Sequence, residues 1–171
     1  MGELPTPQDC LKLLARSDLF HKWKEHHGQD HLTHFFSPLT SDYKVKANWE
    51  VGYYDPHTKK ITVFALLRNN EFEIKPEDDV FQEKKVAVEE LLMQEVKITA
   101  DEALHTFKEK LPEYFPDEVL GDGFLILQTY QGKTTWNFTF ITRTLRFITL
   151  KINSAKGDVD SHLAIDLVQK Q

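Results

Sequence analysis

The chain has 171 residues, 40% of them hydrophobic, and its 12 Phe and 3 Trp supply enough apolar volume for a well-packed core. Its formal net charge of −6 opposes binding to nucleic acid or to a membrane of anionic lipid, because both need an electropositive surface. The lone cysteine, Cys10, excludes an internal disulfide and a multi-cysteine zinc site.

The first residues contain neither a basic region nor an apolar region of the kind that signal peptides carry. No window of the sequence approaches the run of about 20 apolar residues that crosses a bilayer. We therefore expect a soluble, cytoplasmic protein.

Helix signals open the chain. Thr6 is a suitable N-cap, Pro7 occupies the first helical position, and Ser17 interrupts the apolar stripe where it can cap a second helical piece. This pattern predicts a bent helix or two helices, ending near Gly28, a suitable residue for the position after a helix.

From about Asp30 the apolar period changes to that of strands. An Asp-Pro turn follows Tyr54, and a polar "RNN" turn precedes Glu71. The pattern predicts an antiparallel meander, followed from Pro76 to Val96 by a connecting segment with one short helix. The strand segments are "HLTHFF", "YKVKANWEVGYY", "ITVFALL" and "EFEIK".

The signals then begin again. Thr99 and Glu102 form a capping box, which predicts a helix start. The strand segments "FLILQTY", "TTWNFTFI" and "LRFITLKIN" follow, and their apolar register changes phase between Phe140 and Ile148. A bulge or a tight turn is therefore predicted near Thr142 to Thr144.

The two halves share this order of elements, and the second half resembles the PepSY family of small domains, whose fold is a helix across an antiparallel sheet, much like half of a cystatin. The residues that carry the likeness are "ITADEAL" from Ile98 and "LKINSAKGDV" from Leu150, with Gly157 at the turn glycine; Asn153 and Lys156 depart from the family pattern. The resemblance implies an α+β fold of two tandem PepSY/cystatin-like repeats, each an α-helix packed on an antiparallel β-sheet. We expect repeats at 1–84 and 96–171 with a connector at 85–95.

The family occurs in propeptides that inhibit peptidases and in regulatory contexts, and it has no catalytic residues to transfer. We expect a non-enzymatic protein- or peptide-binding or regulatory module with a protein or peptide partner, and the resemblance implies peptidase regulation as one such role. The side chains that we expect to anchor this partner are Trp49, Tyr53, Tyr54 and Trp136, because buried Trp and Tyr dominate binding hot spots.

Two histidine arrangements keep other functions open. His27 and His31 can converge across the Gly28 turn with help from Asp30, which leaves histidine-based metal binding as a weaker alternative. His105 lies one helical turn after Asp101, so a small enzyme with acid–base chemistry is the other alternative. No nucleophile motif or phosphate-binding loop accompanies them, so we expect no catalytic residue, no metal and no cofactor. The sequence leaves the oligomeric state open.

Overall fold

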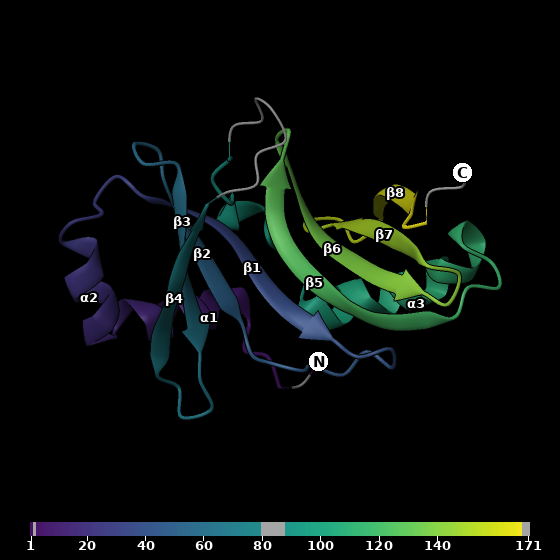
Figure 1. The fold of residues 1–171 in the computed structure, drawn as a ribbon, viewed down its shortest axis with the longest axis horizontal. Coiled ribbons are helices and arrows are strands. Elements are labelled where there is room, and N and C mark those ends of the chain that lie inside the picture. The colour runs from purple at the N-terminus through teal and green to yellow at the C-terminus, as the bar shows by residue number, and fades with distance from the viewer. Residues whose placement is uncertain (2, 80–87, 169–171) are drawn as a thin grey trace.

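We describe the protein from a computed structural model, which covers residues 1, 3–79 and 88–168. It contains three α-helices, one 3₁₀ helix and eight β-strands within the described residues (Figure 1). The elements are α1 (Pro7–Ala15), α2 (Asp18–Lys24), β1 (His31–Leu39), β2 (Glu50–Asp55), β3 (Lys60–Leu66), β4 (Phe72–Asp79), η1 (Met93–Glu95), α3 (Ala100–Tyr114), β5 (Leu120–Tyr130), β6 (Lys133–Thr142), β7 (Arg146–Asn153) and β8 (Val159–Asp166).

All eight strands form one antiparallel sheet in the order β4-β3-β2-β1-β5-β6-β7-β8. The first strand of each half lies at the centre, where β1 pairs with β5 from His34 opposite Gln128 to Leu39 opposite Gly123. The strands that end each half, β4 and β8, therefore lie at the two edges of the sheet.

The expectation of two tandem helix-on-sheet repeats is wrong. One sheet runs through both halves, and a single hydrophobic cluster takes residues from both, so neither half has a core of its own. Trp49 of the first half and Trp136 of the second lie in this cluster with ring centroids 6.2 Å apart. Pairing β1 with β5 joins two strands whose backbone groups would otherwise form free edges in separate sheets. The expected connector at 85–95 lies partly outside the described residues.

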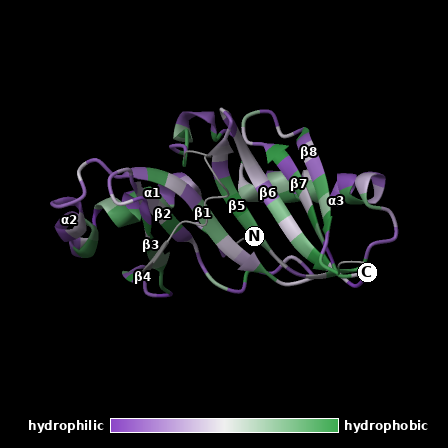
Figure 2. Ribbon diagram, turned by 45° about the horizontal axis from the view of Figure 1, so that its top comes forward, coloured by the Kyte–Doolittle hydropathy of each residue, from purple (hydrophilic) through white to green (hydrophobic). Residues whose placement is uncertain are grey.

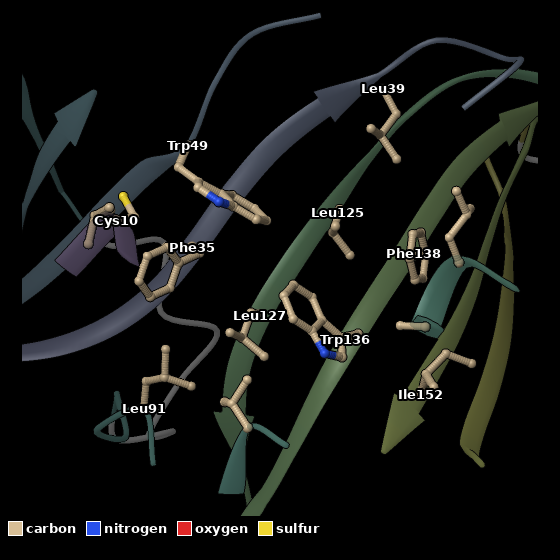
Figure 3. Packing of buried hydrophobic residues seen from close by; sticks show 14 of the residues in the cluster. Cys10, Phe35, Leu39, Trp49, Leu91, Leu125, Leu127, Trp136, Phe138 and Ile152 are labelled. Carbon is tan, nitrogen blue, oxygen red and sulfur yellow. The ribbon is translucent and has the colours of Figure 1, made fainter. Parts of the chain in front are cut away.

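The core lies between the sheet and the helices. Inward-facing side chains alternate along the central strands, and α3 packs against β6, β7 and β8. Figure 3 shows these side chains meeting in one layer, among them Phe35, Leu125 and Phe138, each fully buried. Figure 2 shows hydrophobic residues alternating with more polar ones along β5 and β6.

The opposite surface of the sheet, called here the helix-free face, faces the viewer in Figure 1, with α1 and α3 behind the strands. The side chains on the helix-free face alternate along each strand with those of the core. In the middle of this face, a row of small polar residues is nearly as buried as the core. These are Thr135, Asn137 and Thr139 of β6, which are 5%, 8% and 7% exposed. On β5 they lie opposite Gln128, Ile126 and Phe124.

Several local predictions are confirmed. Thr6 and Ser17 accept hydrogen bonds as N-caps of α1 and α2, and Thr99 and Glu102 form the capping box of α3. The phase change falls at a tight turn between β6 and β7, where Leu145 has φ 59°. Helix α2 ends at Lys24, before the expected Gly28; the chain turns there, and the His27 ring stacks on Trp23 with centroids 4.5 Å apart.

Candidate functional site

The four aromatic residues expected to anchor a partner are all buried. Trp49 and Trp136 are fully enclosed, and each indole N–H donates to a backbone carbonyl, those of Pro5 at 2.8 Å and Ile98 at 3.3 Å. Tyr53 and Tyr54 are 8% and 7% exposed. Their rings contribute to packing, so a surface for a partner has to be built from other residues.

Large apolar side chains do reach solvent at the β8 edge of the sheet. Phe147 of β7 and Leu163 and Ile165 of β8 are 37%, 55% and 53% exposed. Ile165 lies opposite Phe147, and Leu163 lies opposite Thr149, so the three apolar side chains share the helix-free face. We call Phe147, Leu163 and Ile165 the β8 patch.

The backbone of β8 offers hydrogen-bonding groups beside this patch. The amide of Leu167 donates to the carbonyl of Leu145, so these two residues form a hydrogen-bonded pair across the two strands. Every second residue of β8 repeats this arrangement, so Ile165 and Leu163 also form hydrogen-bonded pairs with β7. In an antiparallel ladder these pairs alternate with pairs that point their N–H and C=O groups outward. The outward-pointing residues of β8 are therefore His162, Ala164 and Asp166, and within the described chain no strand pairs with this edge.

Charged groups lie at both ends of β8. Asp166 is 3.3 Å from Arg146, whose guanidinium also donates to Glu118 at 2.8 Å. At the other end, Asp160 accepts from the Asn153 amide at 3.1 Å, and Asp158 is exposed. The edge is thus apolar in its middle and carries carboxylates near both ends, those at the Asp166 end being paired with Arg146.

A hollow of about 220 Å³ opens between the β5–β6 hairpin and β8. Its lining includes Tyr130, Lys151 and Asp160, and the Lys151 ammonium lies 5.1 Å from the centre of the Tyr130 ring. The hollow combines an aromatic ring with charges of both signs, and none of the described residues that line it is a histidine.

Other residues weighed for chemistry lie apart from this region. His105 is an exposed residue of α3 whose Nε2 lies 3.4 Å from Glu109, so it forms a surface pair on its own helix rather than a pair with Asp101. Cys10 is fully buried in the core, and burial raises the pKa of its thiol to about 12, which suppresses the reactive thiolate.

The clustered histidines of the first half do not all converge. His27 Nδ1 lies 3.1 Å from Asp30, whereas His31 Nε2 lies 3.1 Å from the carbonyl oxygen of Val88. His34 is partly buried on the helix-free face against Gly52, where an added Cβ would lie 2.2 Å from the ring. Burial lowers the pKa of His34 to about 4, which keeps the ring neutral at neutral pH.

The β8 patch was missed because the segment "VDSHLAIDLV" has the alternation of a strand with one buried face. The apolar set, Leu163, Ile165 and Leu167, would ordinarily be assigned to the core. In the structure the opposite set faces the helices, and the His162 ring lies 4.5 Å from that of Tyr114. The polar residue His162, among the side chains that face the helices, was the sequence signal that could have indicated which face of β8 is exposed.

The fold and this edge define an α+β protein with a single open antiparallel sheet. It is similar to a solved structure from Clostridium difficile 630 described as a "putative lipoprotein", with 14% identity, a TM-score of 0.52, and coverage of 86% of this chain and 90% of that chain. At this identity the likeness shows the fold alone. No family model and no curated protein matches the chain, so the resemblance to the PepSY family stays a prediction.

The helices that the structure describes are all too short or too polar to cross a bilayer.

Proposed function

We propose that the protein is a non-enzymatic binding module that receives an extended segment of a partner protein as an additional strand along β8. The observation that carries the proposal is the outer edge of β8, with which no strand of residues 3–79 or 88–168 pairs, beside the exposed β8 patch. Strand addition draws affinity from main-chain hydrogen bonds and specificity from alternate side chains.

The edge meets both requirements. The outward N–H and C=O groups of His162, Ala164 and Asp166 match the spacing of an extended partner. On the helix-free face, alternate side chains of the partner would lie beside Leu163 and Ile165. Cross-strand contacts of this kind contribute roughly 0.2–1 kcal/mol per pair.

The other side of the added strand would meet a different surface. His162 lies on the helix side, where its ring contacts Tyr114 and Phe115 with centroids 4.5 Å and 6.0 Å apart. An added strand there would meet aromatic rings rather than open solvent. The partner segment is therefore expected to be apolar on its helix-free side and to tolerate a polar or aromatic residue on the other.

Charge sets the composition expected at the ends of the partner segment. Asp158 is exposed near one end of the edge, Asp166 lies at the other end beside Arg146, and the whole chain carries a formal charge of −6. Complementary potentials speed association and fix register. We therefore expect a partner strand with alternating apolar residues and Lys or Arg near its ends.

The test uses short synthetic peptides with alternating apolar residues and basic ends, measured by fluorescence polarisation against the folded protein. Ala164→Pro removes an outward amide without removing a hydrogen bond to β7, and proline is tolerated on edge strands. We expect this variant to lose binding by at least about tenfold, which corresponds to about 1.4 kcal/mol.

The matched control is Ile74→Pro in β4. The amide of Leu67 donates to the carbonyl of Glu71, so by the same alternation Ile74 also points its amide to the outer edge. This variant should bind the peptides as the unmodified protein does. Equal binding by the Ala164→Pro variant, or no binding of any peptide of this class by the unmodified protein, would contradict the proposal.

A further inference from the structure

A second group of side chains lies far along the chain from β8, where α2, β1 and β2 meet. His27 follows the end of α2, Asp30 precedes β1, and Asp55 is the last residue of β2. Their ligand atoms all lie within 4.8 Å of one another. We call His27, Asp30 and Asp55 the His27 cluster.

The strand register brings the two carboxylates together. His31 lies opposite Tyr54, so Asp30 and Asp55 are the next residues to face each other across the β1–β2 pair. Like charges directly opposite on neighbouring strands destabilise a sheet. Asp55 also contributes to raising the pKa of Asp30, although burial of the Asp30 carboxyl is the larger cause.

Each member of the cluster is held in place by other contacts. The Asp30 side chain is only 4% exposed, and the His27 ring is fixed by stacking on Trp23 at an interplanar angle of 7°. Asp55 Oδ1 accepts from the backbone amide of His57 at 2.8 Å, and this hydrogen bond is the main reason that the pKa of Asp55 is lowered. The cluster is thus organised before any ligand arrives.

We propose that the His27 cluster is a binding site for a divalent cation of the zinc class, which takes one imidazole nitrogen and two carboxylate oxygens from the protein. Imidazole suits Zn²⁺, Co²⁺ and Ni²⁺, whereas Mg²⁺ prefers oxygen ligands alone. Three protein ligands leave at least one coordination position for water or for a group from another molecule.

Charge balance distinguishes this site from an ordinary ion pair. His27 Nδ1 lies 3.1 Å from Asp30 Oδ2, a distance that a protonated imidazole and a carboxylate also adopt. Even when His27 is protonated, the three side chains together keep one net negative charge. A divalent cation reverses that sign and also removes the repulsion between Asp30 and Asp55, which a proton on His27 offsets only in part.

This proposal is independent of strand addition at β8, and the metal alone tests it. Isothermal titration calorimetry with ZnCl₂ on the untagged protein should give one site per chain, together with a rise in the melting temperature. In Asp55→Asn the amide oxygen can still accept from the His57 amide, so the turn is kept while a negative ligand is lost. We expect zinc affinity to fall at least about tenfold and the melting-temperature rise to disappear.

The matched control is His105→Ala, which removes an exposed histidine with a nearby carboxylate, Glu109, from a different part of the surface. It should retain both the affinity and the melting-temperature rise. Unchanged zinc binding in Asp55→Asn, or binding that is lost in His105→Ala, would overturn the assignment.

A spectroscopic measurement covers the case in which Asp55→Asn lowers stability by itself. Co²⁺ bound to an imidazole and two carboxylates has a visible d–d absorption that differs from that of free Co²⁺. The unmodified protein should show this band, and His27→Gln should not. A band that persists in His27→Gln would mean that the metal lies elsewhere.

Discussion

The two edge strands of the sheet differ in what they present to solvent. In β4, Glu73 and Lys75 lie on the helix-free face, and Lys75 forms an ion pair with Glu50 at 2.9 Å. In β8, the corresponding positions are Leu163 and Ile165. Charged side chains protect an edge against pairing with another chain, whereas exposed apolar ones favour it. By this criterion the β4 edge is protected against pairing with another strand, whereas the β8 edge is not.

The largest expected effect tests whether both edges belong to one folding unit. Phe138 is fully buried at the centre of the second half, and its ring centroid is 5.1 Å from that of Phe107. Phe138→Ala should lower the free energy of unfolding by about 3–5 kcal/mol. Since Trp49 and Trp136 share one cluster, urea unfolding followed by fluorescence and by circular dichroism should give a single, coincident transition.

Tyr130→Ala is the control for this measurement, because Tyr130 is 41% exposed and lies at the surface of β5. Its effect should be much smaller than that of Phe138→Ala. Two separate transitions in the Phe138→Ala variant would mean that the β4 and β8 sides have independent cores, and the two edges could then not be compared as parts of one sheet.

The second effect concerns His34, a histidine of the central strand β1. The pKa of His34 is lowered to about 4, and the unfolded value is about 6.5. Between these values the unfolded chain binds a proton that the folded chain does not. The free energy of unfolding should therefore fall as pH decreases from about 6.5 to about 4, by up to about 3 kcal/mol, and this contribution should level off below pH 4.

Urea titrations at several pH values measure this slope. His34→Gln should make the curve flatter through that window. A slope that survives in His34→Gln would assign the acid sensitivity to carboxylates instead.

The local features were predictable from the sequence because they depend on neighbours along the chain. Thr99 and Glu102 are three residues apart, and the phase change near Thr142 lies within a single apolar pattern. The joining of β1 to β5 depends on residues about 90 apart, and no local pattern separates one shared sheet from two. That is why the predicted repeats were wrong although most of their elements were placed correctly.

The same limit applies to the sites. Asp30 and Asp55 meet only through the register of β1 and β2, so the sequence related His27 to Asp30 and His31 but not to Asp55. The residue type of Trp49 and Trp136 predicts a partner surface, yet both rings pack in the core that the two halves share. Which face of a strand is covered is decided by where the helices pack, and alternation alone does not supply it.

The smallest effect on stability is expected from exchanging the apolar side chains of β8 for charged side chains like those of β4. The same exchange should give the clearest change in peptide binding. Leu163→Lys with Ile165→Lys gives β8 a charged surface like that of β4. Both side chains are more than half exposed, so the free energy of unfolding should change by no more than about 0.5 kcal/mol per substitution. Binding of the alternating peptides should nevertheless be lost.

The reciprocal variant, Glu73→Leu with Lys75→Ile, gives β4 an apolar surface on the helix-free face. Light scattering at rising protein concentration should then show self-association that the unmodified β4 edge prevents, because a free apolar edge is a template for pairing. Lys75→Ile leaves the Glu50 carboxylate, whose side chain is only 18% exposed, without this cation, so the variant should lose about 1–3 kcal/mol of stability. If this variant associates no more than the unmodified protein does, charge is not what protects the β4 edge. The exposed apolar residues of β8 would then be insufficient grounds for regarding the β8 edge as available for pairing.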